Sequence, residues 1–440
     1  MKKLSVLIFN LSEDVWPFIQ SLEPQKQAYE IAENTNLAER GIWSLPPKAV
    51  LITALSFSPQ FLAYSKSILK PDYLEILVPQ KNTGRVSLDT LADPKLLARL
   101  RKLGQDYQLE LTCYTASTWF YQLVDYLRHQ GLTITTPESP DQDHLWTRLY
   151  LGSKGGIRQV VDGGFANIKM ADGQVCFDLA QAVGLAAQKY LAKNGVVIKT
   201  NHGHAGMGIL IIRPGEISGG YQAVASEIQK RLQEPYWQLF PIVVEDYVKT
   251  SKVGGGFPNV ECFVTKNKIT MLYACGMRVD QEGVFHGVII SDKAFSPRYL
   301  KRLYAFGTWL GKIYQKYGYR GYYDIDFAAG LGGHLYVTES NTRHTGGTHV
   351  YLLGKKLIGP RFMRQTYTLS NIYRLSQKQT LTSLLNQFKP ILFNPQTKEG
   401  LVIISENLLS QNNLDYVIFA KTQAHALALE ARMEQLLKSL

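Results

Sequence analysis

Short apolar runs alternate with segments of helical periodicity over the first 140 residues. A helix is predicted after residue 117, because Ser117 is a good N-cap, apolar residues recur on one face from Phe120 to Leu127, and Gly131 ends the pattern. A strand over 132–136 follows. This alternation predicts an open α/β layer. Its other strands are expected at Leu4–Phe9, Ala49–Ala54, Leu74–Val78 and Leu109–Tyr114.

A polar stretch with two prolines, residues 137–144, predicts a domain junction. The region beyond it is expected to be rich in sheet, and a long helix is predicted from the Ser296-Pro297 start to Tyr317. We predict three parts: an α/β domain over 1–140, a two-subdomain α+β domain over 141–360, and a small α/β lobe over 361–440. The other predicted elements are a helix over 178–192, strands at 196–199, 209–212, 242–244, 261–265, 269–275, 322–328, 334–339, 400–405 and 416–420, and a helix over 424–437.

Composition narrows the class of protein. The 440 residues are 45% hydrophobic and 19% charged, which excludes collagen-like, coiled-coil and disordered chains. No apolar run reaches the roughly eighteen residues of a membrane span, so no membrane partner is expected. The four cysteines lie far apart, which argues against a zinc site or a disulfide framework and favours a reducing compartment, the cytoplasm.

The net charge of +12 favours anionic ligands. The lysines and arginines are scattered along the chain rather than grouped in a tail or stripe, which argues against nucleic acid as the partner. The oligomeric state cannot be read from the sequence, and a homo-oligomer stays open.

Lys199 ends an apolar strand and is followed by a glycine-rich turn that contains Gly206 and Gly208. Glycines let backbone N–H groups approach phosphate oxygens, and a lysine supplies a compact positive charge. The turn fits neither the P-loop nor the dinucleotide-binding pattern. Taken alone, the turn is also consistent with an ordinary hairpin loop that carries an exposed lysine.

A second group of polar residues lies at the ends of two successive strands. Residues i and i+2 of a strand share a face, so Glu339, Asn341 and Arg343 are expected side by side, with Asp326 on the partner strand. Two carboxylates and an amide oxygen are hard ligands suited to Mg²⁺. Asp324 shares the face of Asp326, and the choice between them stays open. The alternative is a solvated hairpin end.

The order of these residues resembles that of the ATP-grasp enzymes across about residues 145–360. The resemblance implies that two α+β subdomains clasp ATP behind a pre-ATP-grasp α/β domain, with ATP and Mg²⁺ required. The implied roles are phosphate binding by Lys154 and Lys199, adenine contacts by the hinge Glu245-Asp246-Tyr247-Val248, a ribose contact by Glu261, and magnesium ligation by Asp326, Glu339 and Asn341.

A closer resemblance is to the pheganomycin-type peptide ligases, carried by the run Asn341-Thr342-Arg343-His344-Thr345-Gly346-Gly347-Thr348 and by the flanking domains. The chain departs from the pattern through the insertion 249–258 and through histidines in the glycine loop. The resemblance implies an ATP-dependent carboxylate–amine ligase whose substrates are small acids and amines, amino acids or peptides, and which works through an acyl phosphate.

Two arginines are candidates for the chemistry. Arg343, beside the metal ligands, is placed to neutralise the acyl phosphate and the oxyanion, and its alternative is an ion pair with Glu339 or Asp326. Arg278 follows a predicted strand and either meets an anionic substrate or forms a surface ion pair. The competing functions are an ATP-grasp kinase that phosphorylates a hydroxyl and a nucleotide sensor without turnover.

Overall fold

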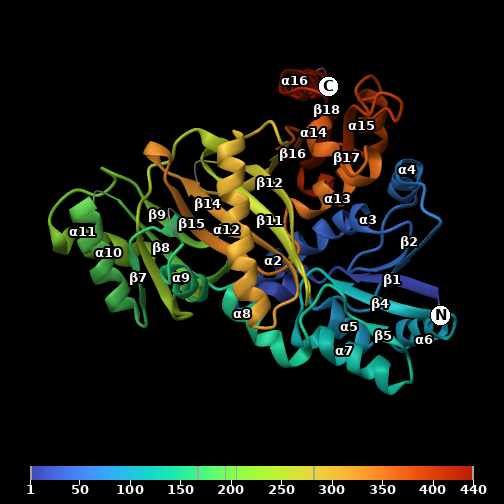
Figure 1. Ribbon diagram of the computed structural model, residues 1–440, viewed down its shortest axis with the longest axis horizontal. Helices are drawn as coiled ribbons and strands as arrows, with labels where there is room; N and C mark the ends of the chain where they lie inside the picture. The colour runs from blue at the N-terminus through green and yellow to red at the C-terminus, as the bar shows by residue number, and fades with distance from the viewer. Residues whose placement is uncertain (1, 166–167, 194, 205, 281–282, 439–440) are drawn as a thin grey trace.

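The computed structural model describes residues 2–165, 168–193, 195–204, 206–280 and 283–438, and these residues form three sheets (Figure 1). The first sheet has the order β3-β2-β1-β4-β5, and every neighbouring pair in it is parallel. The predicted open α/β layer is thereby confirmed. Its strands are β1 (Lys2–Ile8), β2 (Lys48–Ile52), β3 (Tyr73–Leu77), β4 (Tyr107–Cys113) and β5 (Ile134–Thr135).

Helices bury both faces of this parallel sheet, which is why its strands read as continuous apolar runs. The helices α5 (Val86–Leu91), α6 (Pro94–Asp106) and α7 (Thr118–His129) share one core with Leu4, Val6 and Ile8. The Ser117 hydroxyl accepts from the Phe120 N–H at 3.0 Å, which confirms the predicted cap of α7. The other helical segments of this region are η1 (Leu11–Val15), α1 (Trp16–Ser21), α2 (Pro24–Asn36), η2 (Leu37–Glu39), α3 (Arg40–Ser44), α4 (Pro59–Leu69) and η3 (Gln142–His144).

The second sheet is antiparallel, has the order β7-β10-β8-β9, and lies at the end of the molecule farthest from the first sheet (Figure 1). The helices α10 and α11 cover it through a core that includes Ala186, Ile198 and Val244. The glycine turn after Lys199 joins β8 to β9 as a hairpin. The elements of this part are α8 (Leu145–Leu151), α9 (Lys154–Asp162), β6 (Ile168–Met170), β7 (Gly173–Cys176), α10 (Leu179–Lys193), β8 (Val196–His204), β9 (Met207–Ile212), α11 (Tyr221–Arg231), η4 (Pro235–Gln238) and β10 (Ile242–Asp246).

The third sheet has nine strands in the order β17-β18-β16-β13-β12-β11-β14-β15-β6 and runs through the centre of the molecule. The predicted helix is confirmed as α12, whose Leu303, Phe306 and Leu310 pack on the sheet. The central elements are η5 (Val253–Gly256), β11 (Pro258–Val264), β12 (Ile269–Val279), β13 (Phe285–Ile290), α12 (Pro297–Lys316), β14 (Gly321–Ala329), η6 (Leu331–Gly333), β15 (Leu335–Asn341), α13 (Thr348–Leu357) and α14 (Phe362–Gln365).

The C-terminal strands extend this central sheet, because β16 pairs with β13 through Ile289↔Leu369 and Ile290↔Thr368. The sequence pattern contains no signal for this pairing, which depends on residues almost eighty positions apart. The predicted boundaries at 140 and 360 stay a prediction. The elements of this region are β16 (Tyr367–Arg374), α15 (Leu381–Gln387), β17 (Gly400–Ser405), η7 (Asn407–Gln411), β18 (Asn413–Ala420) and α16 (Gln423–Lys438).

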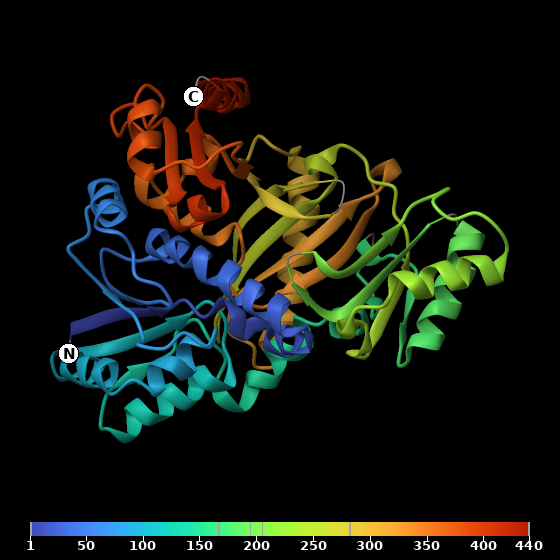
Figure 2. The ribbon, with the colours of Figure 1, turned by 180° about the vertical axis from the view of Figure 1, so that it is seen from behind.

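The N-terminal sheet and the C-terminal strands pack together although they are far apart in sequence (Figure 2). One apolar core joins Leu51 and Trp43 to Val417. The Trp43 indole N–H also donates to the Ile404 carbonyl at 2.7 Å, and Arg40 pairs with Asp415 at 2.7 Å. The N-terminal domain therefore packs directly against the C-terminal end of the central sheet.

All four cysteine side chains are buried and free. In the part of the chain that the structure describes, no helix combines the length and the apolar character that crossing a bilayer requires.

Candidate active site

A cavity of about 410 Å³ lies between the four-stranded sheet and the central sheet. Much of its wall is apolar and includes Val197, Ile211 and Met277. The hinge residues Tyr247 and Val248, which follow β10, also line it. Among the charged residues that line the same cavity are Lys199, Glu245, Asp326 and Glu339.

A second cavity, of about 100 Å³, adjoins the first, and Gly206, Ile209 and Glu339 line both. Its other polar lining comes from four separate regions and consists of Asp14, Lys154, His202, Asn341 and Arg343. The two predicted lysines and the predicted acidic group therefore meet around two adjoining cavities.

Lys199 connects the two sheets. Its ammonium lies 2.6 Å from Glu245 and donates to the Thr338 carbonyl at 3.1 Å, just before Glu339 on β15. The other oxygen of Glu245 pairs with Arg158 of α9 at 2.7 Å. The side chain of Glu245 is thus engaged by two cations, and it fixes the ammonium of Lys199 at the cavity wall.

Lys154 begins α9, where the Ser153 hydroxyl caps the helix by accepting from the Gly156 N–H at 3.0 Å. Its ammonium lies 3.1 Å from the carboxylate of Glu339. Burial by itself raises the pKa of Glu339, but Lys154, Asp326 and Lys199 outweigh it and lower that pKa to about 2. Glu339 is therefore ionised and carries a negative charge between the two cavities.

Two aspartates lie next to Glu339 on the partner strand β14. The Asn259 amide donates to Asp324 at 2.9 Å and to Asp326 at 2.6 Å. Burial raises the pKa of Asp324 to about 7. Burial and the charges of Asp324 and Glu339 hold the pKa of Asp326 well above its usual range. The carboxylates are crowded, and a cation beside them would relieve their repulsion.

These residues fit a Mg²⁺ site that shares its ligands with a phosphate. Among the described residues, no group of three or more His, Cys, Asp and Glu side chains is arranged to hold a metal by itself. Mg²⁺ commonly takes only one or two carboxylates together with substrate phosphates. Asp326 and Glu339 line the large cavity, whereas Asp324 does not and its oxygens accept from Asn259 and Asn341.

Asn341 differs from the expected arrangement. Its amide nitrogen donates to Asp324 at 2.9 Å, and its amide oxygen accepts from Arg343 at 3.0 Å. An amide ligates a metal through its oxygen, which has two lone pairs, and one of them here accepts from Arg343. The structure therefore places Asn341 between Asp324 and Arg343, and its role as a metal ligand stays a prediction.

Arg343 is held from the N-terminal domain. Its Nε donates to Asp14 at 2.6 Å, so the predicted alternative of an ion pair with Glu339 or Asp326 is not the one observed. Asp14 also pairs with Arg148 at 2.5 Å. Burial raises the pKa of Asp14, but Arg343 and Arg148 together hold it below its usual range.

The glycine turn closes over the junction of the cavities. Gly206 and Gly208 have φ of +87° and +77°, a conformation that side chains other than glycine rarely adopt. A Cβ at Gly208 would lie 2.2 Å from the Thr200 hydroxyl oxygen. The backbone of this turn can therefore approach a ligand closely only if glycine occupies these positions.

Glu261 lies away from both cavities, so the expected ribose contact is not supported. It is fully buried, and its carboxylate accepts from the hydroxyls of Tyr273 at 2.6 Å, Thr345 at 2.6 Å and Thr348 at 2.7 Å. Thr345 and Thr348 flank the glycine pair that follows Arg343 in the chain. Glu261 instead anchors this segment to β11.

We expect Glu261→Ala to destabilise the fold by about 3 kcal/mol, because three buried hydroxyls lose their acceptor. Glu261→Gln keeps one amide oxygen as an acceptor and should cost about 1 kcal/mol. Urea unfolding measures both values. In Glu261→Gln the KM for ATP should stay within about twofold of the wild type. A tenfold rise in that KM would restore the ribose assignment.

Arg278 is also placed away from the cavities. Its guanidinium pairs with Glu430 of α16 at 2.6 Å, and Glu430 accepts from the Tyr416 hydroxyl at 2.5 Å. The predicted catalytic role is therefore not supported, and the alternative of an ion pair describes what the structure has. Alternate residues of a strand face opposite sides, so Met277 and Val279 line the large cavity while Arg278, between them, faces away from it.

We expect Arg278→Ala to leave kcat within about twofold of the wild type and to lower the free energy of unfolding by about 1–2 kcal/mol, since Glu430 loses its cation. Steady-state kinetics and urea unfolding of the same preparation measure the two quantities. A tenfold loss of kcat with an unchanged free energy of unfolding would support the predicted catalytic role of Arg278.

Several residues at the site have no recognisable sequence motif. Asp14 and Arg148 lie in separate helical segments, and Asn259 begins a strand that the pattern predicted only from Glu261 onward. One signal could have indicated Asp14: it follows the carboxyl end of the first strand of a parallel sheet, where ligand sites commonly form.

Comparison with known proteins bears on the fold. Residues 38–129 match the Pre ATP-grasp domain family. No curated protein matches the chain in sequence. Solved structures match it along nearly its whole length.

The N5-carboxyaminoimidazole synthetase from Staphylococcus aureus complexed with ADP is 12% identical, with a TM-score of 0.54 and coverage of 98% of both chains. The biotin carboxylase from Campylobacter jejuni, in a β,γ-ATP complex, is 10% identical, with a TM-score of 0.53 and coverage of 96% of this chain and 89% of the other.

A third structure is the biotin carboxylase domain of the Hydrogenobacter thermophilus 2-oxoglutarate carboxylase, in complex with MgADP, ADP and bicarbonate. It is 13% identical, with a TM-score of 0.51 and coverage of 95% of this chain and 86% of the other. Residues 38–129 thus match the model of the Pre ATP-grasp domain family, and nearly the whole chain adopts the fold seen in these three solved structures.

Proposed function

We propose that the protein is an ATP-dependent, ADP-forming ligase that joins a carboxylate to an amine through an acyl phosphate. The observation that carries this proposal is the pair of adjoining cavities with Glu339 at their junction. The larger cavity has the size and the apolar wall suited to a nucleotide base. The smaller one has Arg343 and Lys154, which suit an acid and its phosphate.

In this proposal the adenine lies in the large cavity against Tyr247 and Val248, and the phosphates extend toward Lys199, Lys154 and the glycine turn. The positions of these residues in the cavity walls support the assignment. It is supported further by the similar structures, whose names state complexes with ADP, MgADP and a β,γ-ATP complex.

Asp326 and Glu339 would hold Mg²⁺ between the two cavities. When bound there, Mg²⁺ neutralises charge on the phosphate oxygens. Lys154 and Lys199 add positive charge from the opposite side, at fixed distances from Glu339 and Glu245. Because phosphoryl transfer depends mainly on positioning and charge stabilisation, no separate acid–base pair is required for the first step.

The proposed reaction has two steps. The carboxylate oxygen of the acid bonds to the γ-phosphorus of ATP, the bond to the bridging oxygen breaks, and ADP leaves. The amine nitrogen then bonds to the acyl carbon, the C–O bond to phosphate breaks, and the amine loses a proton. Arg343 lies at the small cavity, where it can stabilise the charge on the acyl phosphate and on the oxyanion.

A kinase with the same ATP site would need an acceptor hydroxyl. The place of Arg343 in the small cavity suits the carboxylate and acyl phosphate of a ligase, and this supports ligation. Amino acids or peptides are the proposed acid and amine, and this narrower assignment depends on the resemblance of the 341–348 segment to the peptide ligases.

Product analysis tests the proposal. The purified protein is incubated with ATP, Mg²⁺ and pooled amino acids and small peptides, and ADP, phosphate and product masses are measured. ADP and phosphate that require both an acid and an amine, with a product mass equal to their sum minus water, indicate ligation. A phosphorylated product would show a kinase, and ATP binding without turnover would show a sensor.

A further inference from the structure

Arg343 is fixed by three acceptors on three sides. Its Nε donates to Asp14 at 2.6 Å, one terminal nitrogen to the His344 carbonyl at 3.1 Å, and the other terminal nitrogen to Asn341 at 3.0 Å. A guanidinium has five N–H donors in a rigid fork. Within the described part of the chain, one N–H on each terminal nitrogen therefore keeps no acceptor, and the side chain lines the small cavity.

Of the three acceptors, only Asp14 carries a charge and only Asp14 comes from the N-terminal domain. His344 and Asn341 lie next to Arg343 in the chain and move with it. Burial lowers the pKa of Arg343, but Asp14, Tyr114 and Asp324 outweigh it and raise that pKa. Asp14 is the charged group to which the Nε of Arg343 donates.

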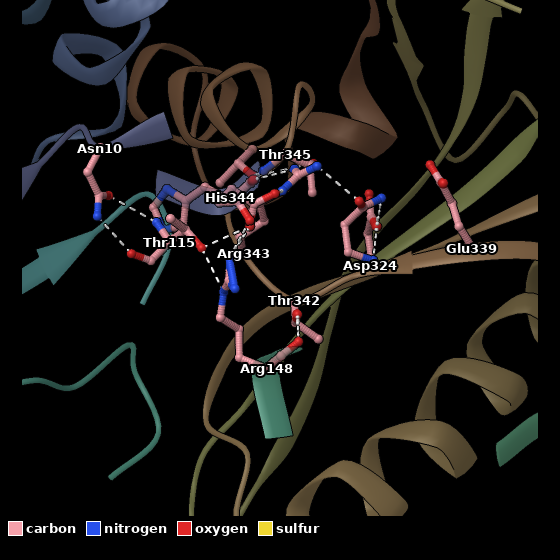
Figure 3. Close-up of polar contacts among 12 residues, drawn as sticks. Asn10, Thr115, Arg148, Asp324, Glu339, Thr342, Arg343, His344 and Thr345 are labelled. Atoms are coloured by element: carbon pink, nitrogen blue, oxygen red, sulfur yellow. Dashed lines mark hydrogen bonds and ion pairs between the residues drawn. The ribbon is translucent and has the colours of Figure 1, made fainter. Parts of the chain in front are cut away.

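Asp14 is itself held rigidly. One of its oxygens accepts from Arg148 at 2.5 Å and from the Thr115 hydroxyl at 3.0 Å, which leaves the other oxygen for Arg343. Arg148 also donates to Thr115 at 2.9 Å (Figure 3). These contacts make Asp14 the link between the first sheet, α8 and the end of β15.

The segment that carries Asp14 has a second support. The neighbouring Glu13 is buried, and its carboxylate accepts from the Asn10 amide at 2.7 Å, from the Ser87 N–H at 2.7 Å and from the Ser117 hydroxyl. The segment η1 is thereby tied to α5 and α7, whose helices pack on the first sheet. The N-terminal domain therefore determines the position of Asp14.

We propose that Asp14 is a positioning residue that orients the guanidinium of Arg343, so that its two remaining N–H groups present a bidentate fork to a carboxylate or acyl phosphate in the small cavity. The N-terminal domain then completes the reaction site of the central domain. This inference depends on the proposed ligase function, because the fork is matched to the planar pair of oxygens of such an anion.

A double-mutant cycle tests the role, with the wild-type ligation assay as the reference. Asp14→Asn should lower kcat about tenfold or more and leave the KM for ATP within about twofold, because Asp14 does not line the large cavity proposed for the adenine. In an Arg343→Ala background the same change should cause no further loss of kcat. Asp14→Glu, which keeps the charge, should recover part of the kcat that Asp14→Asn loses.

Asp106→Asn, an exposed aspartate of the same domain at the end of α6, is the matched control and should change neither kcat nor KM. Additive losses in the double mutant, or an unchanged kcat in Asp14→Asn, would overturn the positioning role and leave the ligase function standing. A wild-type enzyme that forms no ligation product with any pooled acid and amine would overturn the function, and the positioning role with it. Thermal melting of each variant separates loss of fold from loss of orientation.

Discussion

Arg343→Ala should lower kcat for ligation by about a hundredfold or more. Removing a donor that stabilises developing oxyanion charge typically costs this much in other enzymes. Asp14 and Asn341 hold the guanidinium of Arg343 at the small cavity. The side chain therefore does not have to move when negative charge develops on the oxyanion. The KM for ATP should change little, because the large cavity does not include Arg343.

Two further variants sharpen this result. Arg343→Lys should remain at least about tenfold below the wild type, since an ammonium cannot donate to Asp14 and still present a planar fork. Arg298→Ala, an exposed arginine at the start of α12, should behave as the wild type. Steady-state kinetics with saturating ATP measure all three. Full turnover by Arg343→Ala would remove the arginine from the chemistry.

The α/β layer could be predicted because local signals determine it. The strands β1, β2 and β4 end in runs of buried residues, and α7 has its cap and its terminal glycine in the sequence. The hairpin of β8 and β9 could be predicted for the same reason. The pairing of β16 with β13 could not, because it depends on which edge of a finished sheet is open.

The candidate site followed from strand periodicity where its members share a face. Residues of β14 and β15 lie side by side, with Asp324 opposite Asn341 and Asp326 opposite Glu339. Strand periodicity does not predict which charged residue of another domain packs beside the site. Asp14 was therefore not predicted, although it is the residue that pairs with Arg343.

Glu261 and Arg278 lie away from the cavities for a different reason. Glu261 occupies the expected place in the order of motifs and Arg278 was expected just after a strand, but a strand sends alternate side chains to opposite faces. Glu261 meets the hydroxyls of the segment behind Arg343, and Arg278 meets α16. The sequence pattern placed both residues at the ends of strands, whereas β11 and β12 include them, and it did not determine which way their side chains face.

Glu339→Gln should produce the largest loss of activity, on the order of a thousandfold in kcat. This corresponds to a rise of about 4 kcal/mol in the activation free energy, because the transition state for phosphoryl transfer loses electrostatic stabilisation. Glu339 is the charged side chain common to both cavities and the partner of Lys154. The amide is isosteric but neutral, so Lys154 loses its counter-charge and the proposed Mg²⁺ ligand set loses a carboxylate. The Mg²⁺ concentration for half-maximal activity should rise as well.

The fold should tolerate this substitution, which makes the result interpretable. Losing Glu339 leaves Lys154 without its ion pair, but it also removes one of the negative charges that raise the pKa of Asp326. The two changes oppose each other, so the free energy of unfolding should shift by less than about 1 kcal/mol. Glu227→Gln, which breaks an exposed pair with Arg231 on α11, is the matched control for both measurements. If Glu339→Gln kept its turnover and its Mg²⁺ dependence, the negative charge at the junction of the cavities would have no part in the reaction.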